Sequence, residues 1–266
     1  MGYDKEILVK KLFDVYKETM LSPKEVLEKA IRKAVPQAFT VFYAKKNFSK
    51  IIDKIGDEAY KVFLTEQEMA GKRAIKKYFT SLLPDSATRK SSIETVANNF
   101  MEFDRFFLSL AQSRKPRAGS TFEWIIKDLF KKLNYPFAEQ QIINGKPDFL
   151  MPSREHYDKN PMDCIIFTVK TTVRERWRQI VTEGTRGLGF FLATVDDKIS
   201  DNQLSEMLRN RIYLVVSSEL KVKASHYKAA ANVISFEQFF RDHLDPAVKR
   251  WKKVKATKKN VPGTIR

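Results

Sequence analysis

The chain has 266 residues, 43% of them apolar, which is enough for the core of one large domain or two small ones. Its formal net charge of +17 favours a polyanionic partner, most often nucleic acid, although a lysine-rich surface suited to heat is the alternative. No apolar run is long enough for a membrane span, the N-terminus lacks a signal-peptide pattern, and the single cysteine excludes intramolecular disulfides. We therefore expect a cytoplasmic protein with no membrane partner.

The first part of the chain, residues 1–113, has a helical pattern throughout. Apolar residues recur at helical spacing over 4–20, and Ser22-Pro23-Lys24-Glu25 has the cap, proline and acid of a helix start. The pattern predicts further helices, over 48–64, 66–83 and 91–112.

The composition changes at Ser113-Arg-Lys-Pro-Arg-Ala-Gly-Ser120, which is basic and interrupted by Pro and Gly. This stretch predicts a linker, followed by a helix over 121–133. Short apolar runs then alternate with helical patterns. Strands are expected over 140–144, 148–151, 164–171, 188–194 and 212–217 and near residue 233, with helices over 174–183, 202–209 and 236–243.

This alternation predicts an α/β (α+β) fold with a central mixed sheet flanked by helices. The expected division is a helical region at 1–113, a core at 114–248 and a tail at 249–266. The tail is basic around Trp251, and we expect it to be flexible, as either a phosphate contact or a solvated end.

Two charged residues lie at the ends of neighbouring predicted strands. Asp148 begins one strand, and Lys170 ends the next. If the polar loop between these strands lets them pair as an antiparallel hairpin, both side chains lie at the same end. A carboxylate can hold Mg²⁺, and a lysine can orient water or offset charge on a phosphate, so the pair fits phosphodiester hydrolysis. The simpler interpretation is an ordinary solvated strand end.

A lone aspartate binds Mg²⁺ weakly, so a second acid is needed. Glu183 lies on the predicted helix after Lys170, on a stripe that can face the end of the sheet. Glu123, in the first turn of the helix at 121–133, is a further candidate. Between Lys170 and Glu183 in the chain, Arg174-Glu175-Arg176 has the donors and acceptors to recognise consecutive G·C pairs. The simpler interpretation is an exposed first turn of a helix with an ion pair, which is the usual setting of such triplets.

These residues occur in a characteristic order. Pro147-Asp148-Phe149-Leu150-Met151-Pro152-Ser153 is followed by Val169-Lys170-Thr171-Thr172, and then by Arg174-Glu175-Arg176-Trp177-Arg178-Gln179-Ile180 and Glu183. The series, with Ser113–Gly119 and Phe122-Glu123 before it, resembles Type II restriction endonucleases of the PD-(D/E)xK fold. Within that fold it resembles the group of the EcoRII catalytic domain, PspGI and SsoII, and it looks most like PspGI. This group places its second acid after the lysine strand, which explains Thr168 at the usual acidic position.

The resemblance implies the roles of the site residues. Asp148, Lys170 and Glu183 would be the catalytic set, with Asp148 and Glu183 binding Mg²⁺ and Glu123 as an accessory acid. Arg174, Glu175 and Arg176 would recognise the outer pairs of a CC-N-GG type site, with CCWGG as the best expectation and the central base pair flipped out of the helix. Phe48 is the residue expected to stack on a flipped base.

The resemblance also implies partners. A palindromic site in double-stranded DNA requires a homodimer, with residues 1–113 serving dimerisation and DNA contacts and with Arg114, Lys115 and Arg117 on phosphates. A cognate DNA methyltransferase would protect the DNA of the prokaryotic host. Two other functions remain open: a structure-specific repair or junction nuclease of the same fold, and a DNA-binding protein without catalysis.

Overall fold

The structure, a computed structural model, describes residues 5–35, 40–143, 145–173 and 189–259. The chain divides into two compact units. Unit 1 comprises residues 1–34 and 55–121, and unit 2 comprises residues 35–54 and 122–266. The division differs from the expected contiguous regions because residues 35–54 belong with the C-terminal part of the chain.

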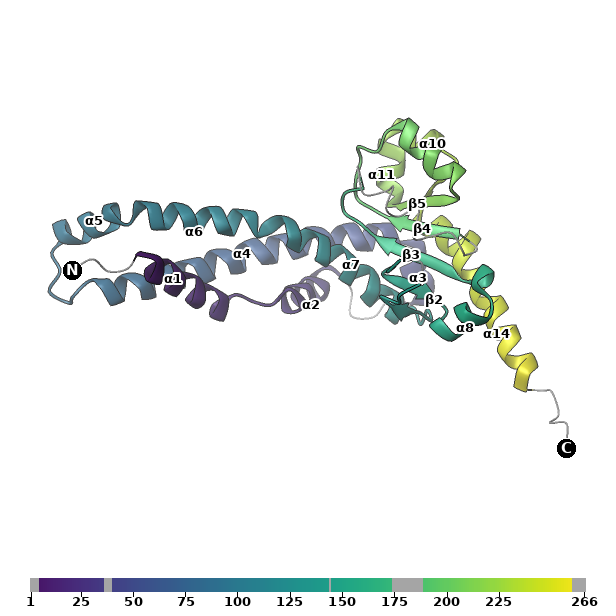
Figure 1. The fold of residues 1–266 in the computed structure, drawn as a ribbon, viewed down its shortest axis with the longest axis horizontal. Coiled ribbons are helices and arrows are strands. Elements are labelled where there is room, and N and C mark those ends of the chain that lie inside the picture. The colour runs from purple at the N-terminus through teal and green to yellow at the C-terminus, as the bar shows by residue number, and fades with distance from the viewer. Residues whose placement is uncertain (1–4, 36–39, 144, 174–188, 260–266) are drawn as a thin grey trace. The chain divides into compact units, whose positions relative to one another are not determined.

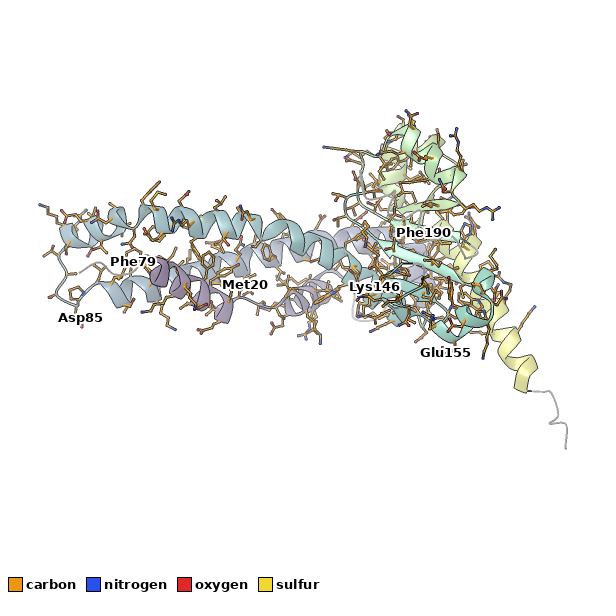
Figure 2. The ribbon with its side chains drawn as sticks, viewed as in Figure 1. Met20, Phe79, Asp85, Lys146, Glu155 and Phe190 are labelled. Atoms are coloured by element: carbon orange, nitrogen blue, oxygen red, sulfur yellow. The ribbon has the colours of Figure 1, made fainter. Side chains whose placement is uncertain are left out.

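Unit 1 is helical, as predicted, and α1, α4 and α6 run side by side in it (Figure 1). The helices that lie in it wholly or in part are α1 (Lys5–Thr19), α2 (Pro23–Ala34), α4 (Phe48–Leu82), α5 (Arg89–Asn98), α6 (Phe100–Gln112) and α7 (Arg114–Lys132). Leu12 and Tyr16 of α1 pack against Ala74 of α4 and Phe106 of α6. Phe79, labelled in Figure 2, adds a ring contact to this core.

Unit 2 is built on a six-stranded sheet in which the strands follow chain order, β1 to β6. The strands are β1 (Ala138–Glu139), β2 (Phe149–Met151), β3 (Ile165–Val169), β4 (Gly189–Ala193), β5 (Ile212–Val216) and β6 (Val233–Ser235). The first three strands pair in antiparallel fashion, and β3 to β6 pair in parallel. The predicted mixed sheet and the predicted antiparallel hairpin are confirmed.

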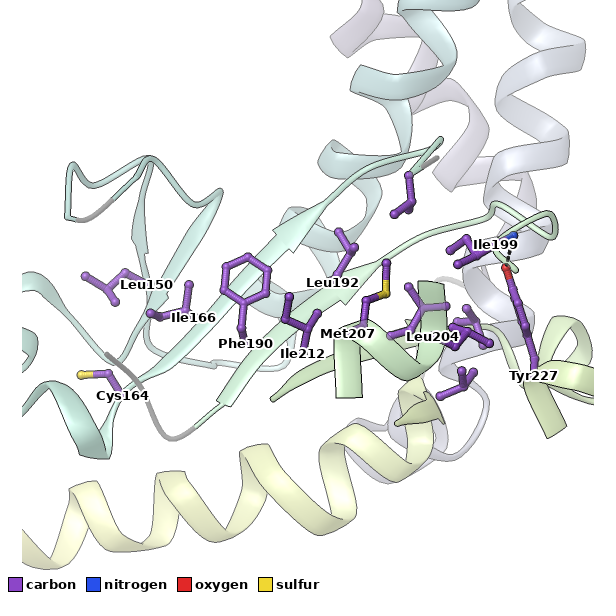
Figure 3. Close-up of a cluster of buried hydrophobic side chains, with 14 residues drawn as sticks. Leu150, Cys164, Ile166, Phe190, Leu192, Ile199, Leu204, Met207, Ile212 and Tyr227 are labelled. Carbon is purple, nitrogen blue, oxygen red and sulfur yellow. Dashed lines mark hydrogen bonds between the residues drawn. The ribbon is translucent and has the colours of Figure 1, made fainter. Parts of the chain in front are cut away.

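The two faces of this sheet are both covered. On one face Ile166 and Phe190 pack against Leu204 and Met207 of a helix, and Cys164 is a buried member of the same cluster (Figure 3). Phe190 is also labelled on its strand in Figure 2. The opposite face carries aromatic contacts, among them Phe167 with Phe130. Strand β3 therefore alternates its side chains between two cores.

The remaining helices of unit 2 lie between and after the strands. They are α3 (Val41–Lys46), α8 (Arg154–Lys159), η1 (Pro161–Asp163), α10 (Asp201–Arg209), α11 (Ser218–Lys223), α12 (Ser225–Ala229), α13 (Phe236–Phe239), η2 (Phe240–Leu244) and α14 (Asp245–Lys259). Ser235 begins α13 with a capping box in which Gln238 is its partner.

Four expectations about local structure are wrong. The linker at 113–120 is part of α7, because Pro116 falls in its first turn, where a missing N–H costs no hydrogen bond. The helices predicted over 48–64 and 66–83 are one helix, α4, and the helix predicted over 91–112 is two. The strand expected at 140–144 is replaced by β1. Residues 249–259, the first part of the expected tail, belong to α14, and the flexibility of the tail stays a prediction. Among the described residues, no helix is long and apolar enough to cross a membrane.

Candidate active site

The site lies at the end of the β2–β3 hairpin where β3 finishes. Phe149 pairs with Phe167 across the two antiparallel strands, so Asp148, just before β2, and Lys170, just after β3, lie at the same end of the hairpin. The predicted proximity of the two side chains is confirmed: Lys170 Nζ lies 3.5 Å from Asp148 Oδ2. The end of a core strand therefore carries a carboxylate and an ammonium group in contact.

Asp148 is buried and is held by the strand beside it. Its Oδ2 accepts hydrogen bonds from the Thr168 hydroxyl and from the Val169 backbone N–H, each at 2.7 Å. The Lys170 ammonium provides the third contact to the same oxygen. Within the described residues these contacts all end on Oδ2, which leaves Oδ1 for a further ligand. A buried carboxylate oriented in this way can present one oxygen to a cation.

Glu123, on α7, belongs to the same site. Burial, followed by the neighbouring Asp148 charge, raises the pKa of Glu123 above its ordinary value, while Lys170 and Lys127 partly offset the shift. Repulsion between two nearby carboxylates is relieved by a bound cation. The donor set, hard oxygens with an adjacent lysine, therefore fits a Mg²⁺ ion.

Several predicted site residues fall where the structure does not describe them. Arg174, Glu175, Arg176 and Glu183 lie outside the described residues. Arg114, Lys115 and Arg117 occupy the first turn of α7. Among the described residues, no three His, Cys, Asp or Glu side chains form a complete metal site. Of the two predicted metal ligands, Asp148 and Glu183, the structure therefore describes only Asp148, with the predicted accessory acid Glu123 near it.

The prediction for Phe48 conflicts with its position in the core. Phe48 has no exposed surface, and its ring contacts Phe130, Phe236 and Phe240. A base could reach this ring only if the aromatic cluster opened, so its burial argues against a stacking role. The sequence could not distinguish an exposed phenylalanine from a buried one in a stretch where both α3 and α4 carry aromatic residues.

Sequence analysis also missed the part played by Thr168. Its position in the usual acidic place suggested only that the second acid lay elsewhere. In the structure Thr168 is buried and its hydroxyl is a direct hydrogen-bond donor to Asp148. The antiparallel register was the available clue, because extending it by one residue sets Thr168 opposite Asp148. Cys164 belongs to the core, and burial raises the pKa of its thiol to about 12.

Two solved structures resemble this chain over 90% or more of its length. Metal-depleted Ecl18kI in complex with uncleaved, modified DNA matches with a TM-score of 0.74 and 24% identity, covering 99% of this chain and 88% of that one. The restriction endonuclease PspGI in a substrate DNA complex matches with a TM-score of 0.60 and 19% identity, covering 90% and 96%. The fold is therefore that of the restriction endonucleases, as predicted.

Sequence comparisons identify the family within that fold. The family model described as EcoRII C terminal matches residues 83–240, more than half of the chain, and the chain belongs to this family. The Type II restriction enzyme SsoII of Shigella sonnei is 29% identical over 162 residues, which cover 56% of this chain and 52% of that enzyme. The Type II restriction enzyme EcoRII of Escherichia coli is 34% identical over 140 residues, covering 49% and 35%. The matches thus span about half or less of these relatives.

Proposed function

We propose that the chain is a Mg²⁺-dependent endonuclease that cleaves double-stranded DNA at a short palindromic site of the CC-N-GG type, best represented by CCWGG. The observation that carries this proposal is the contact of Lys170 with a buried, oriented Asp148 at the end of β3. Membership of a family whose similar proteins are named Type II restriction enzymes supports it.

The metal would be held by Asp148 and Glu183, with Glu123 as an accessory acid. When bound, Mg²⁺ polarises the phosphate and lowers the pKa of a bound water. Thr168 and Val169 serve this site by fixing Oδ2 of Asp148, so that Oδ1 is presented without reorganisation. Glu123 contributes a carboxyl group whose pKa is raised, first by burial and then by the neighbouring Asp148 charge.

Lys170 would act on the reacting phosphate. Its side chain is 33% exposed, while its contact with Asp148 keeps it beside the metal-binding carboxylate. From this position the ammonium group can orient the attacking water or offset negative charge that develops on the phosphate. Because a lysine at an ordinary solvated strand end would have no buried carboxylate partner, the contact favours the catalytic interpretation.

Base recognition would follow directly from β3 along the chain. Arg174, Glu175 and Arg176 begin four residues after Lys170, and their side chains offer the bidentate donors for guanine and the acceptor for cytosine. Arg114, Lys115 and Arg117 would contact phosphates, as the net charge of +17 favours. Recognition and cleavage would then be joined within one short segment.

If the central base pair is flipped, an exposed aromatic residue must receive it. We assign this role to Phe42 of α3 in place of Phe48, because Phe42 is 76% exposed and belongs to the same unit as Asp148 and Lys170. Tyr43, beside it, is 47% exposed. A planar ring that already faces solvent needs no opening of the core to stack on a base.

The active form would be a homodimer, because a palindromic site presents two equivalent half-sites related by two-fold symmetry. Unit 1 supports this proposal with apolar side chains that its own core does not cover. Those on α5 and α6 are Ile93, Val96, Phe100, Met101, Phe107 and Leu108. A second copy of this chain would bury them, and a cognate DNA methyltransferase would protect the DNA of the host cell, in whose cytoplasm the enzyme would act.

The direct test is cleavage of phage DNA of known sequence by the purified protein with Mg²⁺. We expect discrete fragments whose ends all map to CC-N-GG sites, and no cutting when the same DNA has been methylated at those sites. A panel of branched substrates separates the alternatives. Cutting at junctions without sequence preference indicates a repair nuclease, and binding without cutting in Mg²⁺ indicates a DNA-binding protein.

A further inference from the structure

Two lysines of α7 lie near the candidate active site. Lys127 and Lys131 follow Glu123 at intervals of four residues, so the three side chains lie along one face of the helix. Burial first, and then the Asp148 charge, raise the pKa of Glu123. Lys170 and Lys127 act in the opposite direction, so Lys127 is within electrostatic reach of the site.

Glu139, at the end of β1, contacts both of these lysines. Its Oε2 forms an ion pair with Lys127 Nζ, and its Oε1 lies 3.5 Å from Lys131 Nζ. Burial alone raises the pKa of Glu139, but the two lysines outweigh burial and hold the pKa below its ordinary value. One ionised carboxylate therefore bridges two ammonium groups at the surface of unit 2, and the cluster keeps a surplus of positive charge.

The register of β1 sets this cluster next to Asp148. Glu139 pairs with Phe149 across the antiparallel strands, and Gln140 donates its backbone N–H to the Asp148 carbonyl at 3.1 Å. The Phe149 ring contacts Phe130 of α7, so α7 covers the face of the sheet to which Phe149 belongs. The two lysines and the candidate metal ligand thus lie on adjacent elements of one unit.

The simplest interpretation of the cluster is a surface ion pair, which contributes little to stability. Its position favours a second one. Successive phosphates of one DNA strand are about 3.4 Å apart along the helix axis, so a duplex with one phosphate at Asp148 and Lys170 brings further phosphates to the adjacent elements. Lysine binds phosphate as a point charge, and the Glu139 carboxylate occupies the place that a phosphate takes.

We propose that Lys127 and Lys131 bind backbone phosphates of duplex DNA beside the cleaved bond, and that Glu139 occupies both ammonium groups until a phosphate displaces it. The inference rests on the proposed function. In the free protein the ion pairs keep the two lysines ordered, so less conformational freedom is lost when DNA binds. Glu139 lowers the affinity for all sequences alike, because a phosphate contact carries no base information.

The test compares this cluster with a second ion pair on another face of α7. Lys132 Nζ lies 2.7 Å from Asp128 Oδ2, so Lys132→Gln and Asp128→Asn remove the same charges from the same helix. They are the matched controls for Lys127→Gln and Glu139→Gln. Binding to cognate and non-specific duplexes in Ca²⁺ is measured over a range of salt concentrations, together with single-turnover cleavage at saturating enzyme in Mg²⁺.

We expect Lys127→Gln to weaken binding to both duplexes about fivefold and to lower the salt slope by about one. Glu139→Gln should have the opposite sign and tighten binding about threefold, because the lysines no longer have a competing partner. Both control variants should bind within about twofold of the wild type, and cleavage of the bound duplex should change little in every variant. Equal weakening by Lys127→Gln and Lys132→Gln, or looser binding by Glu139→Gln, would overturn the inference.

A combined variant separates displacement of Glu139 from simple charge repulsion. In a chain that carries Lys127→Gln and Lys131→Gln, no ammonium group of the cluster remains to be released, so adding Glu139→Gln should no longer tighten binding. Repulsion between a carboxylate and DNA is present in either background. The same tightening with and without the two lysines would therefore contradict the inference.

Two further outcomes keep the inference separate from the proposed function. If the wild type binds no DNA, the proposed function fails and the inference falls with it. If the wild type binds and cleaves while Lys127→Gln binds normally, the inference alone is overturned. Melting temperatures verify folding, and Lys131→Gln, at a side chain that is 57% exposed, replaces Lys127→Gln if that variant is unstable, with the same outcomes.

Discussion

Strand β3 has an aspartate near each of its two ends, and the two carboxylates are used in different ways. Near the amino end, Asp163 Oδ2 lies 2.9 Å from His156 Nε2, and Oδ1 accepts from Arg250 Nε at 3.2 Å. The Trp251 indole N–H donates to the Asp163 carbonyl. Near the carboxyl end, the contacts of Asp148 within the described residues converge on one oxygen.

The difference shows how to distinguish a structural carboxylate from a candidate catalytic one near the same strand. Both carboxylate oxygens of Asp163 contact helices: Oδ2 contacts His156 of α8, and Oδ1 accepts from Arg250 of α14. Neither oxygen is therefore without a partner that a ligand would have to displace. Asp148 is held on one side only, next to a lysine and within electrostatic reach of Glu123. The residue type is the same at the two ends, and Asp163 is partly buried where Asp148 is buried. The distribution of hydrogen bonds over the two carboxylate oxygens separates them.

The largest effect is expected at Lys170. Lys170→Ala removes the ammonium group that would act on the reacting phosphate, and we expect single-turnover cleavage to fall by about 100-fold to 1,000-fold. Binding to the cognate duplex in Ca²⁺ should be largely retained, because the base-contacting residues are untouched. Arg250→Ala, which removes a cation from the opposite end of β3, is the matched control. Normal cleavage by Lys170→Ala would show that the catalytic assignment is wrong.

A smaller loss of activity is expected at Thr168. Thr168→Val preserves shape but removes the hydroxyl that fixes Asp148 Oδ2, and a hydrogen bond to a charged group is worth about 1.5–3 kcal/mol. We expect cleavage to fall about tenfold at low Mg²⁺ and to recover in part as Mg²⁺ is raised, because the metal can reorder a loosened carboxylate. A rate that is low at every Mg²⁺ concentration would indicate a damaged fold and not a loosened metal ligand.

At the structural end the effect should appear in stability alone. Asp163→Asn weakens the contacts with His156 and Arg250, at a cost of about 1–2 kcal/mol, which lowers the melting temperature by roughly 2–8 °C. Cleavage well below that temperature should stay within about twofold of the wild type. A large loss of cleavage with unchanged melting would mean that this end also takes part in catalysis.

The smallest effect concerns the charge on Glu123. Its pKa is raised in the folded protein, so the group favours folding below its unfolded pKa, and that contribution is lost as the pH rises through the folded pKa. Without metal, Glu123→Gln should therefore melt higher than the wild type at neutral pH, and the difference should shrink towards pH 4. Melting curves in EDTA across this range provide the measurement. A constant difference at all pH values would exclude the ionised carboxylate as its cause.

Much of the sheet, and the proximity of Asp148 to Lys170, could be predicted from the sequence because both depend on residues that are close together in the chain. Alternating apolar residues in 164–170, with a polar loop before them, define the β2–β3 hairpin, and the hairpin brings Asp148 to Lys170. The family resemblance added the order of the acids and the assigned roles, which spacing alone left open. Fold class and family were both confirmed by the comparisons.

The predictions that failed depend on contacts between distant parts of the chain. Phe48 is buried by Phe130, Phe236 and Phe240, none of which is near it in sequence. Pro116 and Gly119 suggested a break, yet α7 begins early enough for the proline to fall in its first turn. The hydrogen bond from the Val173 N–H to Asp196 Oδ2 could not be predicted either, because 23 residues separate its partners.

The most direct test of the difference between the two ends is a paired measurement of single-turnover cleavage by Asp148→Asn and Asp163→Asn on one cognate duplex in Mg²⁺. We expect Asp148→Asn to lose at least about 100-fold in rate and Asp163→Asn to remain within about twofold of the wild type. Equal rates for the two variants would contradict the assignment of catalysis to the carboxyl end of β3.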